Sequence, residues 1–88
     1  MDDGIDGQMT AVHAELFDLE AFRELVLYLT RRERDVFDRL IEGESAEEAA
    51  VAIGMSRKTV DFHRYQILAK LKVKSTPRLI RLASKAGF

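Results

Sequence analysis

Two helix-capping motifs and the glycines that follow them constrain this chain more than any other feature. Thr30-x-x-Glu33 and Ser45-x-x-Glu48 each set a hydroxyl residue three positions before a glutamate, so that both side chains can bond free backbone N–H groups at a helix start. Gly43 ends the first helix in the left-handed conformation that glycine tolerates. Gly54-Met55-Ser56 then makes a turn, with Ser56 as the next cap. The pattern predicts short helices separated by tight turns.

Apolar residues recur at helical spacing inside these segments. In the segment after Thr30 they are Val36, Phe37, Leu40 and Ile41. In the helix expected from Ser56 to about Leu71, one side carries Val60, His63, Ile67 and Leu71, which we assign to the core. A last helix is expected from Thr76, with Thr76 as its cap and Pro77 in its first position.

The chain begins with a stretch of different character. Residues 1–14 are read as a flexible acidic tail and residues 15–28 as an amphipathic helix, capped by Asp18 and with Phe17 and Phe22 at the spacing of a hydrophobic staple. Its apolar stripe, continued by Leu25, Val26 and Leu29, must bury against this domain's own core or against a partner chain. The fold class expected is all-α: a tetrahelical helix-turn-helix domain over residues 29–88 with an additional N-terminal amphipathic helix.

Composition excludes several classes of protein. A chain of 88 residues is one small domain, and without cysteine it has neither a disulfide nor a thiolate metal site. The longest apolar run, from Leu25 to Leu29, is too short to span a bilayer, and the acidic start is unlike a signal peptide. We therefore expect a cytoplasmic protein without a membrane partner.

Charge is distributed very unevenly. The residues before Leu29 hold seven acids and one base, whereas those from Ser56 onward hold nine bases and one acid. A basic half of this kind is typical of polyanion binding, although solvated helical faces would give the same count.

The helix after Ser56 is suited to reading DNA, because polar, cationic and apolar side chains near its N-terminus can reach base edges while neighbours neutralise phosphates. The candidate DNA-binding residues are Arg57, Lys58, Thr59, Asp61, Phe62, Arg64, Tyr65 and Lys70. Lys72 and Lys74 continue the basic surface beyond them.

The same residues resemble the DNA-binding domain of LuxR/FixJ-type transcription regulators. That pattern has Leu-Thr-x-Arg-Glu, a glycine, Ser-x-x-Thr-Val-x-x-His, then Lys-Leu and Lys-Ser pairs. Here these are Leu29, Thr30, Arg32, Glu33, Gly43, Ser56, Thr59, Val60, His63, Lys70-Leu71 and Lys74-Ser75. The segment from Ser75 to Phe88 resembles the FixJ branch.

The resemblance implies a sequence-specific regulator of transcription that places this helix in the major groove of double-stranded DNA. By position, Asp61, Phe62 and Tyr65 would contact bases, with Thr59 and Arg64 near phosphates. Many members carry a lysine or arginine in place of Asp61 and a small aliphatic residue in place of Phe62. Asp61 could accept from cytosine N4 or repel a phosphate, and Phe62 could pack on a thymine methyl group. Ala46 and Glu47 likewise replace a usual polar and basic pair.

The resemblance also implies homodimers on a pseudo-palindromic operator. The expected dimer contacts lie on the last helix: Pro77, Leu79, Ile80, Ala83 and Ala86. About 28 residues precede the matched region, so the chain is either a stand-alone regulator or a fragment of one with a further domain. The acidic front helix would brace the domain, extend the dimer or cover the basic surface; we favour bracing or dimerisation.

No catalytic, metal or cofactor pattern accompanies these features, so we do not expect an enzyme. His63 and His13 have no metal-ligand spacing, and His63 is expected as a packed, hydrogen-bonded core histidine. Two other functions stay open. One is the promoter-reading domain of a sigma factor, which would bind RNA polymerase. The other is a protein-interaction module that no longer binds DNA and instead titrates another regulator. Asp61, Glu47 and the acidic N-terminal segment support this alternative.

Overall fold

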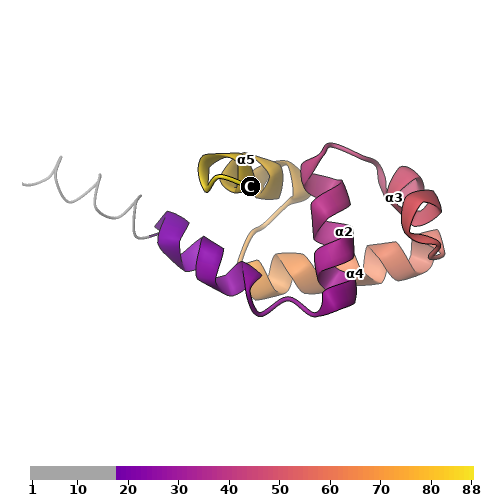
Figure 1. The fold of residues 1–88 in the computed structure, drawn as a ribbon, viewed down its shortest axis with the longest axis horizontal. Helices are drawn as coiled ribbons and strands as arrows, with labels where there is room; N and C mark the ends of the chain where they lie inside the picture. Colours follow the sequence, from indigo (N-terminus) through magenta and orange to yellow (C-terminus); the bar gives the residue numbers. More distant parts are fainter. Residues whose placement is uncertain (1–17) are drawn as a thin grey trace, which may run out of the picture.

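The computed structural model describes residues 18–88, and this part of the chain is entirely helical (Figure 1). A helical segment over residues 18–26, called here the front helix, precedes four helices. These are α2 (Arg31–Ile41), α3 (Ala46–Ile53), α4 (Arg57–Leu71) and α5 (Thr76–Lys85). The predicted tail over residues 1–14, and Phe17 of the predicted staple, lie outside the described residues.

Both predicted capping boxes are present. Thr30 Oγ1 accepts from Glu33 N at 3.1 Å while Glu33 Oε1 accepts from Thr30 N at 2.9 Å. Ser45 and Glu48 make the same exchange at 3.1 and 2.8 Å. Gly43, with φ of 87°, follows α2 in the predicted left-handed conformation. The local sequence thus decides where α2 and α3 begin and where α2 ends.

Two of the predicted caps are wrong. Asp18 already lies within the front helix, so it does not cap it. The cap of α5 is Ser75, whose Oγ accepts from Arg78 N at 3.3 Å, and Thr76 is the first helical residue. Pro77 therefore occupies the second position of α5, where its missing N–H is still tolerated because the first turn leaves these groups unbonded.

The core forms around α2, which packs against α3, α4 and α5. Figure 1 shows α2 crossing α4, with α3 at one end of α4 and α5 with the front helix at the other. Val36, Phe37 and Leu40 of α2 meet Val60 and Ile67 of α4, and all five are at most 2% exposed. The predicted apolar faces of these two helices are confirmed, and their burial fixes how α4 is turned.

The front helix packs on this domain's own core. Phe22 and Val26 are 3% and 2% exposed, and Leu25 and Leu29 pack beside them. The ring of Phe22 lies 6.0 Å from that of Phe88, centroid to centroid, in an edge-on arrangement. Arg23 Nη1 also donates to Ala86 O at 3.1 Å. The front helix and the C-terminus are therefore held together. Of the roles considered for the front helix, its packing supports bracing of the domain.

Candidate nucleic-acid interface

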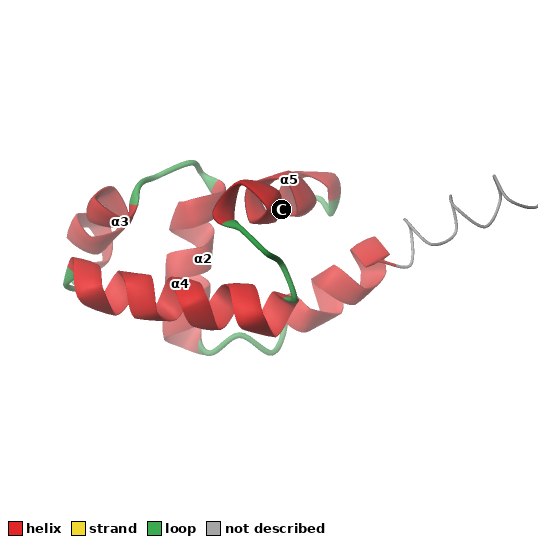
Figure 2. Cartoon of the chain, turned by 180° about the vertical axis from the view of Figure 1, so that it is seen from behind, coloured by secondary structure: helices red, strands yellow, loops and turns green. Residues whose placement is uncertain are grey.

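Helices α3 and α4 form a helix-turn-helix (Figure 2). Gly54, in the left-handed conformation with φ of 79°, turns the chain out of α3, and no atom lies within 4 Å of the position a Cβ would take. Strain, and not crowding, therefore favours glycine at this site. Ser56 caps α4 by accepting from Thr59 N at 3.1 Å, and its Oγ lies 2.9 Å from Thr59 Oγ1.

Helix α4 has two unlike sides. Val60, Ile67 and Leu71 face the core. The opposite side carries exposed residues at positions i, i+4, i+7 and i+11, a row we call the outward stripe: Lys58, Phe62, Tyr65 and Ala69. The rings of Phe62 and Tyr65 are 60% and 66% exposed. Because α4 packs on α2 and α3 through its other side, this stripe is the part of α4 that a groove of DNA would meet.

Asp61 lies at the side of the stripe between two arginines. Its carboxylate oxygens are 3.8 Å from Arg57 Nε and 3.5 Å from Arg64 Nε. Arg57 Nη1 also bonds Glu47 Oε1 of α3 at 2.6 Å. The acid–base chain Glu47–Arg57–Asp61–Arg64 spans the turn between the two helices. Sequence reasoning noticed both acids but missed their pairing. The Glu47–Arg57 contact arises only in the folded chain, whereas Asp61 lies four and three positions from Arg57 and Arg64 on one helix, a spacing that could have revealed those pairs.

Lys70 forms an ion pair with Glu33 inside the fold. Its Nζ lies 2.7 Å from Glu33 Oε1, and Glu33 is only 5% exposed. Burial raises the pKa of the Glu33 carboxyl, but bonds from the Lys70 ammonium and from Thr30 outweigh it, so the pKa lies below its ordinary value. Lys70 thus links α4 to the start of α2, which makes it a weak candidate for a phosphate contact.

A second set of cations stands free of such partners. Among the described residues, Lys58, Lys72, Lys74, Arg78 and Arg81 are exposed and make no ion pair or hydrogen bond through their side chains. Lys72 and Lys74 follow the C-terminal end of α4, and Arg78 lies in the first turn of α5. The sequence analysis places Lys72 and Lys74 on a basic surface. It counts Arg78 and Arg81 among the nine bases of the basic half but does not name them as DNA-binding candidates.

His63 differs from its prediction. It is half-buried, and its buried Nδ1 finds no hydrogen-bond partner within the described chain. Its ring instead lies edge-on to that of Phe62, with centroids 5.8 Å apart. The expected hydrogen-bonded core histidine is therefore wrong in its bonding, since no acceptor or donor of the surrounding helices reaches Nδ1.

The dimer contacts predicted on α5 need correction. Leu79, Ala83 and Ala86 are 0%, 1% and 5% exposed because they complete this chain's own core, and buried side chains cannot also meet a partner. Pro77 is exposed and Ile80 half-buried. Dimerisation through α5 stays a prediction, and Pro77 and Ile80 are the predicted contacts that a partner could still reach.

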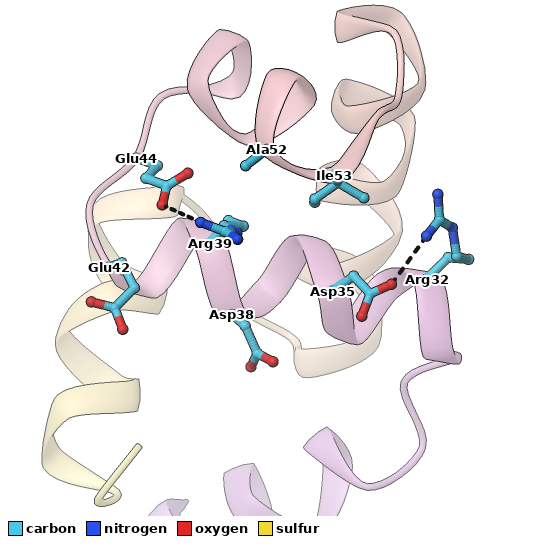
Figure 3. Close-up of a pocket in the computed structure, with 8 residues that line it drawn as sticks. All are labelled: Arg32, Asp35, Asp38, Arg39, Glu42, Glu44, Ala52 and Ile53. Carbon is cyan, nitrogen blue, oxygen red and sulfur yellow. Dashed lines mark hydrogen bonds and ion pairs between the residues drawn. The ribbon is translucent and has the colours of Figure 1, made fainter.

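Two hollows on the described part of the chain differ in the charge of their lining. The larger, of 760 Å³, lies between α2 and α3, and Figure 3 shows its charged rim. Four carboxylates, of Asp35, Asp38, Glu42 and Glu44, outnumber the guanidinium groups of Arg32 and Arg39 there. This rim would repel phosphates. The smaller, of 520 Å³, lies between the front helix, the segment after α4, and α5, and its lining includes the cations Lys72, Lys74 and Arg78. In the described part of the chain, no helix is long and apolar enough to cross a membrane.

Known proteins share this arrangement. Residues 27–83 match the family described as "Bacterial regulatory proteins, luxR family". The transcriptional regulatory protein FixJ of Rhizobium meliloti (strain 1021) is 34% identical over 80 residues, which make up 91% of this chain and 39% of that protein. The transcriptional regulatory protein TdiR of Thauera aromatica is 37% identical over 64 residues, or 73% of this chain and 28% of TdiR.

A solved structure agrees with these sequences. Full-length FixJ from B. japonicum aligns with a TM-score of 0.74 at 26% identity, over 99% of this chain and 47% of that one. The chain thus spans less than half the length of each of these relatives. The matched region contains the helix-turn-helix described above together with α2 and most of α5, and this chain therefore belongs to the luxR family of bacterial regulatory proteins.

Proposed function

We propose that this chain binds double-stranded DNA sequence-specifically and regulates transcription in the cytoplasm, with α4 in the major groove. The observation that carries the proposal is the outward stripe, a capped helix face that the core leaves exposed. Lys58 on the stripe, with Lys72 and Lys74 beyond it, supplies unpaired cations for phosphates. The names of the relatives, transcriptional regulatory proteins, support the same conclusion.

The proposal includes homodimers on a pseudo-palindrome, with half-sites about one helical turn apart. Exposed Pro77 and half-buried Ile80 on α5 would form the contact. An Ile80→Glu variant should then sediment as a monomer on a DNA duplex that carries two half-sites, at a concentration where the wild type sediments as a dimer. If the variant and the wild type bind the duplex with the same number of protein chains, Ile80 of α5 is not part of the dimer interface.

Selection from a randomised duplex pool tests the central proposal. We expect a palindromic motif to be enriched, and its affinity, followed by fluorescence anisotropy, to fall steeply with salt as counterions are released. Lys58→Ala should weaken binding to all sequences about equally and reduce the salt slope by about one. Arg39→Ala is the matched control, because it removes the same charge from the α2–α3 groove.

A protein-interaction module is the second candidate, and the acids beside the stripe favour it. Glu47 and Asp61 offset the charges of Arg57 and Arg64, which would otherwise attract phosphates. No enrichment from the pool and only weak binding at low salt, together with a stable complex with another regulator, would replace the DNA-binding proposal by this one.

A further inference from the structure

We propose that α4 selects its DNA site by packing Phe62 and Tyr65 against the 5-methyl groups of thymines. This inference rests on the proposed DNA-binding function and names the base that the outward stripe recognises.

The first argument is the exposure of the two rings. Phe62 and Tyr65 are 60% and 66% exposed, while Phe22 and Phe37 of the same domain are 3% and 0% exposed. The core is therefore complete without the two rings of α4. Two large apolar side chains that share one exposed helix face are available for burial on binding.

The second argument is direction. Phe62 and Tyr65 occupy the middle of the outward stripe, so they extend furthest from the core when α4 enters a groove. Three residues of helix advance about 4.5 Å, and one base pair advances about 3.4 Å. The two rings should therefore reach neighbouring base pairs, or pairs two steps apart.

The third argument is chemical. The thymine methyl is the apolar group that the four bases present in the major groove. The Phe62 ring has no hydrogen-bonding group with which to tell the other edges apart, and the Tyr65 ring has one only at its hydroxyl. The Arg64 guanidinium lies 5.0 Å from the centroid of the Tyr65 ring and stacks on it. That contact restrains the ring and leaves its outer edge exposed.

The structure also weakens the competing reader. Asp61 could accept from cytosine N4, but its two oxygens already face Arg57 and Arg64 at 3.8 and 3.5 Å. A cytosine amino group would have to compete with these two guanidinium groups for the carboxylate and also desolvate it. Contact between the aromatic rings and a methyl group breaks no bond.

Parallel selections test the inference: one from a randomised duplex pool containing thymine, the other from a pool in which uracil replaces thymine. Uracil pairs with adenine but lacks the 5-methyl group. We expect a motif with thymines at neighbouring positions from the first pool, and weakened or no enrichment from the second. The same motif from both pools would overturn the inference while preserving DNA binding. No motif from either would overturn both this inference and the proposed function.

Single substitutions then assign the contacts. In the selected site, replacing one contacted thymine by uracil should weaken wild-type binding by about fourfold, the effect of one buried methyl-sized group. Phe62→Ala should bind the thymine and uracil versions of its position equally, and Tyr65→Ala should do the same at its own position. Val51→Ala is the control, because Val51 is an apolar residue of α3 that is 85% exposed and lies off the stripe. Full discrimination by both α4 variants would refute the assignment.

Discussion

Two regions along α4 use aromatic residues in opposite ways. Beyond its C-terminal end, where the front helix meets α5, the rings of Phe22, Phe37 and Phe88 pack together with centroids 5.6–6.5 Å apart. In its middle, Phe62 and Tyr65 face outward. The first region therefore supplies stability, while the second presents side chains that contribute little to the folded monomer. Substitutions should separate the two roles cleanly.

The largest effect should come from the packed end. Phe22→Ala removes a buried ring and should lower the free energy of unfolding by roughly 3–4 kcal/mol, because the cavity cannot collapse fully. Phe62→Ala, at an exposed site, should change it by less than about 0.5 kcal/mol. Urea denaturation followed by circular dichroism measures both. Equal losses of unfolding free energy in the two variants would mean that Phe62 stabilises the fold as much as Phe22 does.

The free cations offer the next largest effect. Replacing both Lys72 and Lys74 by alanine should weaken DNA binding by roughly 30-fold at 0.15 M salt and lower the salt slope by about two, if each lysine neutralises one phosphate. The melting temperature should be nearly unchanged, since neither side chain makes a hydrogen bond or an ion pair with another described residue. An unchanged salt slope would place the phosphates elsewhere.

The paired lysine should behave differently from these two. Lys70→Ala leaves the Glu33 carboxylate buried without its cation, so the free energy of unfolding should fall by about 1.5–3 kcal/mol. The salt slope of DNA binding should stay as in the wild type. If the variant shows a reduced salt slope of DNA binding and unchanged stability, Lys70 contacts a phosphate after all.

The pH dependence of folding reports on the same pair. The folded pKa of Glu33 lies below its ordinary value of 4.5, so the stability that it contributes is present above about pH 4.5 and is lost as the pH falls through the lowered pKa. Glu33→Gln cannot titrate, so its stability should fall less steeply over that acidic range. Parallel curves for the two proteins, from melts between pH 3 and 6, would contradict this role.

The smallest effect concerns the acid beside the stripe. Glu47→Gln frees Arg57 from its 2.6 Å ion pair and removes one negative charge near the proposed phosphates. Because exposed ion pairs are weak, the affinity for DNA should rise by no more than about fivefold, mainly at low salt. Weaker binding by the variant would mean that Glu47 positions Arg57 productively.

Local sequence determined the secondary structure of this protein almost completely. Hydroxyl–glutamate pairs and glycines specify the ends of α2 and α3 through bonds to residues only three positions away, so no distant contact is needed. Apolar spacing likewise identified Val60, Ile67 and Leu71 as the buried side of α4. The error at Thr76 is a shift of one residue from the actual cap, Ser75, and local rules separate such neighbours poorly.

Tertiary structure decided which of the predicted functional residues are accessible to a partner and which are buried or ion-paired within the fold. The pairing of Lys70 with Glu33 joins residues 37 positions apart, and the burial of Leu79 and Ala83 depends on how α5 packs against α2. The contact between α3 and α4 likewise pairs Arg57 with Glu47, ten positions away. Helical periodicity says which residues share a face, but only the packing of the neighbouring helices determines which charged side chains meet across helices and which predicted contacts become buried.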